Sequence, residues 1–178
     1  MMVPVGSTPA FVAWGAFALL LAAACVSDLR TRRIPNALVL ALAAAGLVFA
    51  VVSRPWLAGL GFSLGGLATG LAIWLPFWLL GMMGAGDVKL FAAGAAWLGA
   101  GEAVEAALLA AFAGGALSLL YWMVAHGPSL TFMRLAQGVH EPAALRGEAP
   151  ERWQRRMPYG LAMAAGLLLA AWRPGFLF

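Results

Sequence analysis

Two aspartates stand out in a chain that otherwise avoids charge. Asp28 lies in CVSDLRTRRIPN and Asp87 in GAGDVKL, and they are the only aspartates among the 178 residues. Two carboxylates brought close together do not both ionise easily, so the pair shares one proton. The ionised member can act as a general base on water, and the protonated member as a general acid toward a peptide carbonyl. This is the chemistry of an aspartic protease, and it needs no metal, cofactor or nucleophilic side chain.

Each aspartate also has a structural interpretation. Asp87 follows Gly86 and precedes a predicted helix, so its carboxylate is suited to cap the helix amides. Asp28 ends a predicted helix, where the macrodipole disfavours a carboxylate unless the neighbouring arginines offset that cost. Lys89 is a rival partner for an aspartate, and it is equally suited to tune the local field or to contact a substrate. Gly84 and Gly86 would let a bound extended peptide approach closely.

Membrane helices must position these side chains. Hydrophobic residues make up 63% of the chain and charged residues 10%, against about 45–50% and about 25% in soluble proteins. A helix needs about 20 apolar residues to span the hydrocarbon. Charge is absent from 1–27, 34–53, 55–86, 106–133 and 157–172. These runs are rich in Ala, Leu and Gly without alternation, which predicts helices rather than a β-barrel.

We predict an all-α polytopic bundle that forms one transmembrane domain over residues 1–178. Its helices are expected at 8–27, 36–53, 56–81, 87–101, 103–125 and 158–174. Asn36 is expected to cap the second helix. Residues 126–157 form the one sizeable polar segment.

The distribution of charge predicts the orientation of the bundle. Nine of the eleven Lys and Arg residues fall in 27–35, 82–89 and 126–157, whereas the opposite side carries only Arg54 and Arg173. Cytoplasmic loops of membrane proteins carry an excess of basic residues. The sequence therefore predicts both termini outside, and both aspartates and the 126–157 loop on the cytoplasmic side.

The fourth helix is predicted to be short. Asp87 to Gly101 is 15 residues, or about 22 Å of helix, whereas the hydrocarbon is about 30 Å thick. Asp87 would then lie below the membrane surface. Because ionisable groups at such depth usually face water-filled cavities, we expect a recess on the cytoplasmic face.

Three motifs together resemble a known family. SDLRTRRIPN after the first helix, GAGDVKL at the fourth and MPYG at the last resemble type IV prepilin peptidases, which are GxGD membrane aspartic proteases. The compact length resembles the short form of Tad/Flp pilus systems. The resemblance implies that Asp28 and Asp87 are catalytic, and that prepilins and pseudopilins are cut at their basic leader on the cytoplasmic face of the bacterial inner membrane. It also implies that Pro158, Tyr159 and Gly160 line the site.

One departure from the family concerns its second activity. Longer prepilin peptidases carry a cytoplasmic insertion with paired cysteines after the first helix and also methylate the new N-terminus. Here the link between the first two helices is about nine residues and holds no cysteine. We therefore predict peptidase activity without N-methyltransferase activity. Cys25, the single cysteine, is expected to be a small buried apolar side chain.

Two other functions are compatible with the sequence. A proton-coupled transporter would use the aspartates as a relay, although neither an inverted repeat nor acidic residues spread through the membrane are visible. A non-catalytic subunit of a pilus or secretion apparatus would use them only as helix caps. No metal-ligand cluster is visible, no cofactor is expected, and basic loops in a membrane protein report orientation rather than nucleic-acid binding. The partners expected are substrate and membrane lipid, and the sequence leaves the oligomeric state open.

Overall fold

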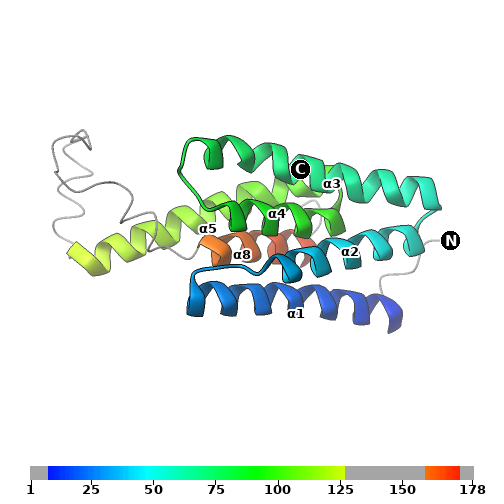
Figure 1. Cartoon of the computed structure of the whole chain (residues 1–178), viewed down its shortest axis with the longest axis horizontal. Helices are drawn as coiled ribbons and strands as arrows, with labels where there is room; N and C mark the ends of the chain where they lie inside the picture. The colour runs from blue at the N-terminus through cyan, green and yellow to red at the C-terminus, as the bar shows by residue number, and fades with distance from the viewer. Residues whose placement is uncertain (1–7, 127–158, 173–178) are drawn as a thin grey trace.

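The computed structural model describes residues 8–126 and 159–172, and every element in these ranges is a helix (Figure 1). In chain order the helices are α1 (Thr8–Thr31), α2 (Asn36–Ser53), α3 (Trp56–Leu79), α4 (Ala85–Leu98), α5 (Ala100–His126) and α8 (Tyr159–Trp172). The predicted all-α bundle of about six helices is confirmed for this part of the chain. The predicted polar loop lies outside the described residues beyond His126.

Four of these helices are long and apolar enough to cross a membrane. The qualifying segments are Phe11–Thr31, Asn36–Ser53, Trp56–Leu79 and Ala100–Leu120. Helices α4 and α8 have 14 residues each, which is about 21 Å and less than the hydrocarbon thickness of about 30 Å. The six spans expected from the sequence are therefore four full-length helices and two short ones.

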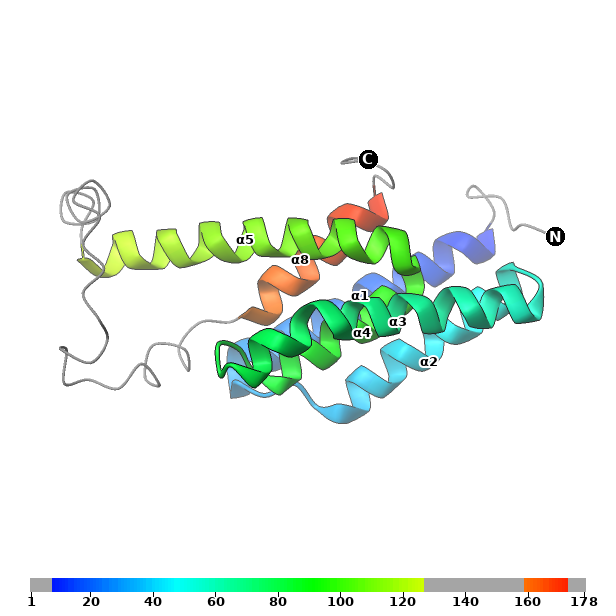
Figure 2. The ribbon, with the colours of Figure 1, turned by 90° about the horizontal axis from the view of Figure 1, so that it is seen from above.

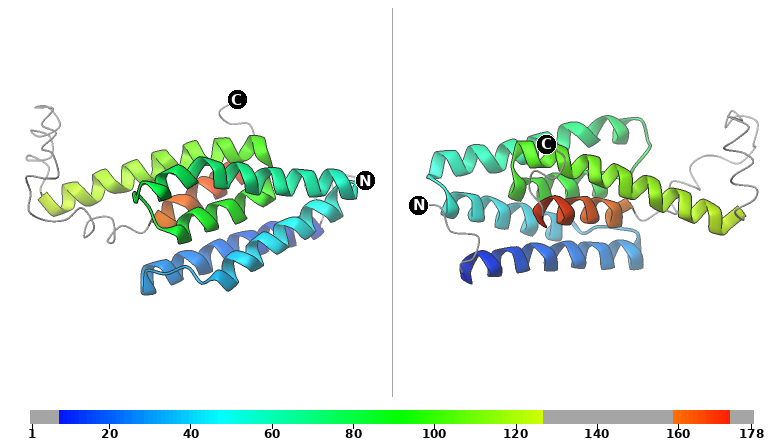
Figure 3. Two further views of the ribbon diagram at one scale, coloured as in Figure 1. Left: turned by 45° about the horizontal axis from the view of Figure 1, so that its top comes forward. Right: turned by 180° about the vertical axis from the view of Figure 1, so that it is seen from behind.

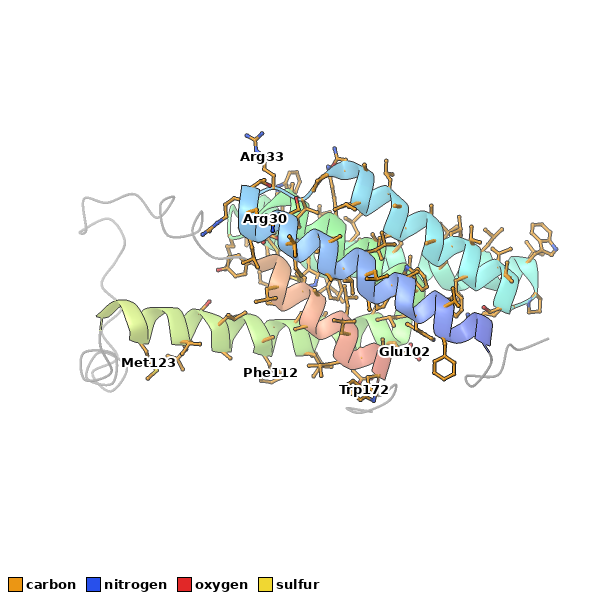
Figure 4. All side chains as sticks on the ribbon, turned by 90° about the horizontal axis from the view of Figure 1, so that it is seen from below. Arg30, Arg33, Glu102, Phe112, Met123 and Trp172 are labelled. Atoms are coloured by element: carbon orange, nitrogen blue, oxygen red, sulfur yellow. The ribbon has the colours of Figure 1, made fainter. Side chains whose placement is uncertain are left out.

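The outer surface of the bundle is apolar. Large side chains such as Leu80, Phe112 and Trp172 are more than two-thirds exposed, and Figure 4 shows Phe112 and Trp172 projecting away from the helices. A soluble protein rarely exposes so much contiguous apolar surface. Lipid is the natural cover for it, and the chain is a membrane protein.

The short helix α4 lies at the centre of the bundle (Figures 1 and 3). It packs against α1, α2, α3, α5 and α8. Asp87, Val88 and every residue from Leu90 to Leu98 are buried. From Leu90 onward α4 is apolar on all sides, as expected for a helix that is enclosed by protein.

Small residues on α3 allow α4 to approach closely. Gly59, Ser63, Gly66 and Gly70 form one buried stripe along α3. A methyl group added at Gly66 would overlap the carbonyl of Ala95, and one at Gly70 would lie 2.9 Å from the Ala95 Cβ. Membrane helices use such small residues to bring their backbones together.

An aromatic cluster fixes the other side of α4. Trp97 packs against Trp14, Phe17 and Phe49 with ring centroids 5.1–6.1 Å apart. Its indole Nε1–H donates to the Leu42 carbonyl at 2.9 Å, which satisfies a polar group that would otherwise be costly to bury. These contacts tie α4 to α1 and α2 and hold its register.

Only α2 has both of its predicted ends, and the other helices begin or end one to four residues away from the predicted positions. Helix α1 continues four residues beyond position 27, and the Thr31 hydroxyl in its last turn donates to the Ser27 carbonyl at 2.8 Å. Helix α4 spans Ala85–Leu98 rather than 87–101, and it ends at Gly99, whose φ of 85° suits glycine. The cap of α2 is Pro35, and Asn36 is its first helical residue.

Candidate active site

The buried face of α1 carries Asp28 into the bundle. Phe17, Leu21, Ala24 and Asp28 are all buried and recur at intervals of three or four residues, which places them on one helix face. Asp28 stands in the last turn of α1, and only 8% of it is exposed. The apolar stripe that anchors α1 therefore ends in a carboxylate.

The turn after α1 fixes the position of that carboxylate. Arg32 adopts a left-handed conformation with φ of 54°, which is typical of a residue that ends a helix. Its N–H donates to the Asp28 carbonyl at 2.8 Å. The Ser27 hydroxyl donates to the Arg33 carbonyl at 2.9 Å. Arg32 also lies close enough to Asp28 to interact with its charge.

Asp87 is the third residue of α4 and is 9% exposed. The cap of this helix is Gly84, and the Gly84 backbone N–H donates to the Asp87 carboxylate. An acidic residue at this position commonly reaches back to the cap N–H and favours the positive end of the helix dipole. The expectation that Asp87 is itself the cap is wrong, although the carboxylate still serves the start of its helix.

The two aspartates come together from distant parts of the sequence. The last turn of α1 and the first turns of α4 and α8 lie at the same end of the bundle (Figures 1 and 2). Asp28 and Asp87 are close enough there for their charges to interact. Within residues 8–126 and 159–172, the buried Oδ2 atom of Asp28 has no hydrogen-bond partner. A buried carboxylate oxygen without a partner calls for an explanation, because most are satisfied.

Helix α8 closes over Asp28 through Gly160. The Gly160 N–H donates to the Asp28 carboxylate, and the Cys25 thiol faces the Gly160 carbonyl at 3.7 Å. A Cβ atom at position 160 would lie 2.9 Å from Asp28 Oδ2. The sequence pointed to Gly160 only through the family motif. It gave no sign that Cys25 contacts the same peptide unit.

The other predicted site residues lie at different distances from the pair. Gly84 is exposed, and a Cβ there would lie 3.1 Å from Asp87 Oδ2. A Cβ at Gly86 would instead lie 3.6 Å from Ile34, in ordinary contact. Lys89 is exposed and does not share the buried site. Tyr159 is half-buried at the start of α8, and Pro158 lies outside the described residues.

The charged side chains around the pair are basic. Figure 4 shows Arg30 and Arg33 projecting from the end of the bundle that holds the aspartates, whereas Glu102 lies toward the other end. In the described part of the chain, no three His, Cys, Asp or Glu side chains are close enough together to hold a metal ion. The groups that the described helices bring together at this end are two carboxylates with basic side chains nearby.

Comparison with known proteins finds a family whose model matches this chain. The model of the type IV leader peptidase family matches residues 15–119, which is more than half of the chain and includes both aspartates. The prepilin leader peptidase/N-methyltransferase of Pectobacterium carotovorum subsp. carotovorum is 33% identical over 121 residues, or 64% of this chain. That match covers 43% of the relative, so the chain spans less than half of its length. No solved structure matches the chain significantly. With both aspartates inside the matched stretch, the chain belongs to the type IV leader peptidase family.

Proposed function

We propose that the protein is a membrane-embedded aspartic endopeptidase that cuts the basic leader from type IV or Flp prepilins and pseudopilins. The observation that carries this proposal is the buried pair of Asp28 and Asp87, brought together from α1 and α4 with one oxygen of Asp28 unpartnered. The Asp28 carboxylate accepts a hydrogen bond from Gly160, and the Asp87 carboxylate accepts one from Gly84. Caps alone do not require two carboxylates to be buried side by side.

The pair is suited to peptide hydrolysis by a shared proton. The ionised carboxylate takes a proton from water as the water oxygen adds to the scissile carbonyl, and the protonated carboxyl donates its proton to the carbonyl oxygen. As the C–N bond of the tetrahedral intermediate breaks, the departing amine receives the proton held by the first carboxylate. The second carboxylate takes back a proton from one hydroxyl of the intermediate as the product carboxyl group forms, and the pair returns to its starting state. Burial at one end of the bundle favours proton sharing, because like charges close together do not both form easily.

The peptidase is proposed to act without methylating the new N-terminus. The link between α1 and α2 comprises only residues 32–35 and contains no cysteine. This supports the short Tad/Flp form of the enzyme, without the cytoplasmic insertion of longer family members. The basic residues around the pair support a cytoplasmic site in the bacterial inner membrane, since basic loops stay inside.

The proposal is tested by replacing each aspartate with its amide. Asp28→Asn and Asp87→Asn nearly preserve shape but remove one titratable member, so prepilin processing should fall by about 10² or more. Cells that co-express a prepilin with a basic leader report cleavage as a mobility shift, and membrane fractionation reports insertion.

Glu102→Gln is the matched control, because it makes the same change toward the opposite end of the bundle. It should process prepilin normally. If either aspartate variant kept near-normal turnover, the pair would not be catalytic.

A further inference from the structure

A cavity of about 500 Å³ opens between α3, α5 and α8. We call it the α3–α5 groove. Its volume is that of a ligand pocket, which is commonly about 300–1,000 Å³. Its walls are almost entirely apolar, and Phe77, Met82 and Leu108 on its rim are between one-third and one-half exposed. Figure 2 shows how α5 runs over α8 and diverges from α3 toward its C-terminal end.

The groove adjoins the aspartate pair on two sides. Tyr159 lines it, and the next residue, Gly160, donates its N–H to Asp28. Met83 also lines it, and the following Gly84 donates its N–H to Asp87. A peptide in the groove would therefore lie next to Tyr159 and Met83, each one residue away from the glycine N–H that donates to a carboxylate.

One polar atom of a wall residue has no partner. Trp74 lines the groove, and its ring packs against Phe77 and Phe91. Trp74 is 91% buried, and its Nε1–H has no hydrogen-bond acceptor among the described residues. A buried N–H calls for an acceptor. Because the Nε1 atom is itself buried, an occupant of the groove meets the Trp74 ring rather than this N–H.

We propose that the α3–α5 groove binds the apolar segment that follows the scissile bond of the substrate. This inference rests on the proposed function and names where that peptidase holds its substrate. Val104, Leu108, Ala111, Gly115 and Ser118 line the groove from α5 and recur at intervals of three or four residues, so they form one continuous helix face. An apolar helix laid into such a groove is a common mode of peptide recognition. The unwound end of that helix would then reach the aspartates.

Filling the groove tests the proposal. A Cβ at Gly115 meets nothing within 4 Å, so Gly115→Leu adds bulk to the groove without disturbing the backbone. Gly61→Leu is the matched control, because Gly61 is also an exposed helical glycine with nothing within 4 Å of its Cβ. Two substrates are compared: a prepilin with its basic leader and apolar segment, and a short peptide that contains the leader and cut site only.

Gly115→Leu should lower kcat/KM for the long substrate about tenfold through KM and leave cleavage of the short peptide unchanged. Equal kinetics of Gly115→Leu and Gly61→Leu on the long substrate would overturn the proposal.

Cross-linking identifies the occupant independently of turnover. A photo-reactive phenylalanine analogue replaces Ala111, which lines the groove, in an Asp87→Asn protein mixed with the long substrate in phospholipid vesicles. We expect a cross-link to the apolar segment of the substrate. Cross-links to lipid only, or to the protein's own chain only, would overturn the groove assignment. Wild-type cleavage of the long substrate without a substrate cross-link would leave the peptidase proposal standing and remove the groove. A substrate cross-link without any wild-type cleavage would support the groove assignment and contradict the peptidase proposal.

Discussion

The position of the Asp28 side chain is set by two helices, α1 and α8. Its own helix carries it inward on a buried stripe, and Gly160 of α8 lies against its carboxylate. The Gly160 peptide is in turn contacted by Cys25, one helical turn before Asp28. A glycine is required at position 160 by this close approach, because any side chain there would meet the carboxylate.

Gly160→Ala should therefore impair catalysis rather than binding. Its Cβ would lie 2.9 Å from Asp28 Oδ2, so the carboxylate must shift. Misplacement of a catalytic group by about 1 Å can cost about 10² in rate. We expect kcat to fall at least tenfold while KM changes little, as measured by steady-state cleavage of a prepilin in detergent.

Gly65→Ala provides the control for this change. Its Cβ would approach nothing closer than the Ala100 Cβ at 3.8 Å, and kcat should stay within twofold of wild type. A Gly160→Ala enzyme with normal kcat would mean that Asp28 tolerates displacement, and the positioning role of α8 would be wrong.

The approach of α3 to α4 is the main constraint at the scale of elements. Because a Cβ at Gly66 would overlap the Ala95 carbonyl, Gly66→Ala should push the two helices apart. Overpacking of this kind typically costs about 1–3 kcal/mol. The expected result is a lower thermal unfolding temperature in detergent, followed by circular dichroism.

Gly61→Ala belongs to the same helix but adds a methyl group into open space. It should unfold at the wild-type temperature or slightly above, since alanine favours helix more than glycine does. Equal unfolding temperatures for the two variants would contradict tight α3–α4 packing.

Much of the arrangement of elements was predictable from charge and hydropathy. The uncharged segments of the sequence predicted where the helices lie, and α2 has the predicted bounds 36–53. The ends of α1 and α4 were not predictable in this way. Helix α1 continues past Asp28 because Thr31 and Arg32 bond back into its last turn, and α4 begins at Ala85 because the Gly84 backbone caps against Asp87. Both depend on hydrogen bonds that composition does not reveal.

The candidate site was also only partly predictable, because residue types can be read from the sequence but long-range contacts cannot. Two aspartates in an apolar chain are conspicuous, so Asp28 and Asp87 were found from residue type alone. The contact of Gly160 with Asp28, the thiol of Cys25 near Gly160 and the cavity beside Trp74 join residues far apart in sequence. No local pattern encodes such contacts, because they arise only when α1, α3 and α8 pack.

The molecule as a whole has a charge asymmetry between its two ends. Arg30 and Arg33 project from the end that holds the aspartates, and Glu102 lies toward the other (Figure 4). Basic residues are retained on the cytoplasmic side of membranes. We expect reporter fusions at Arg33, Lys89 and Gly147 to read cytoplasmic, and fusions after Arg54 and Phe178 to read external.

Paired reporters, one active only inside the cell and one only outside, make each fusion its own control. An external signal at Arg33 or Lys89 would place the aspartates on the wrong side of the membrane for cutting a cytoplasmic leader.

Enclosure of α4 also bears on how the molecule is made. Helix α4 is too short to cross the bilayer alone, and two of its neighbours, α5 and α8, follow it in the chain. Synthesis proceeds from the N-terminus, so Asp87 leaves the ribosome before two of the helices that enclose it, and Gly160 reaches Asp28 later still. A nascent chain that ends before α8 thus carries both aspartates in an unfinished setting. For the proposed peptidase, the site would be complete only once α8 has packed against α1, after nearly all of the described chain has been made.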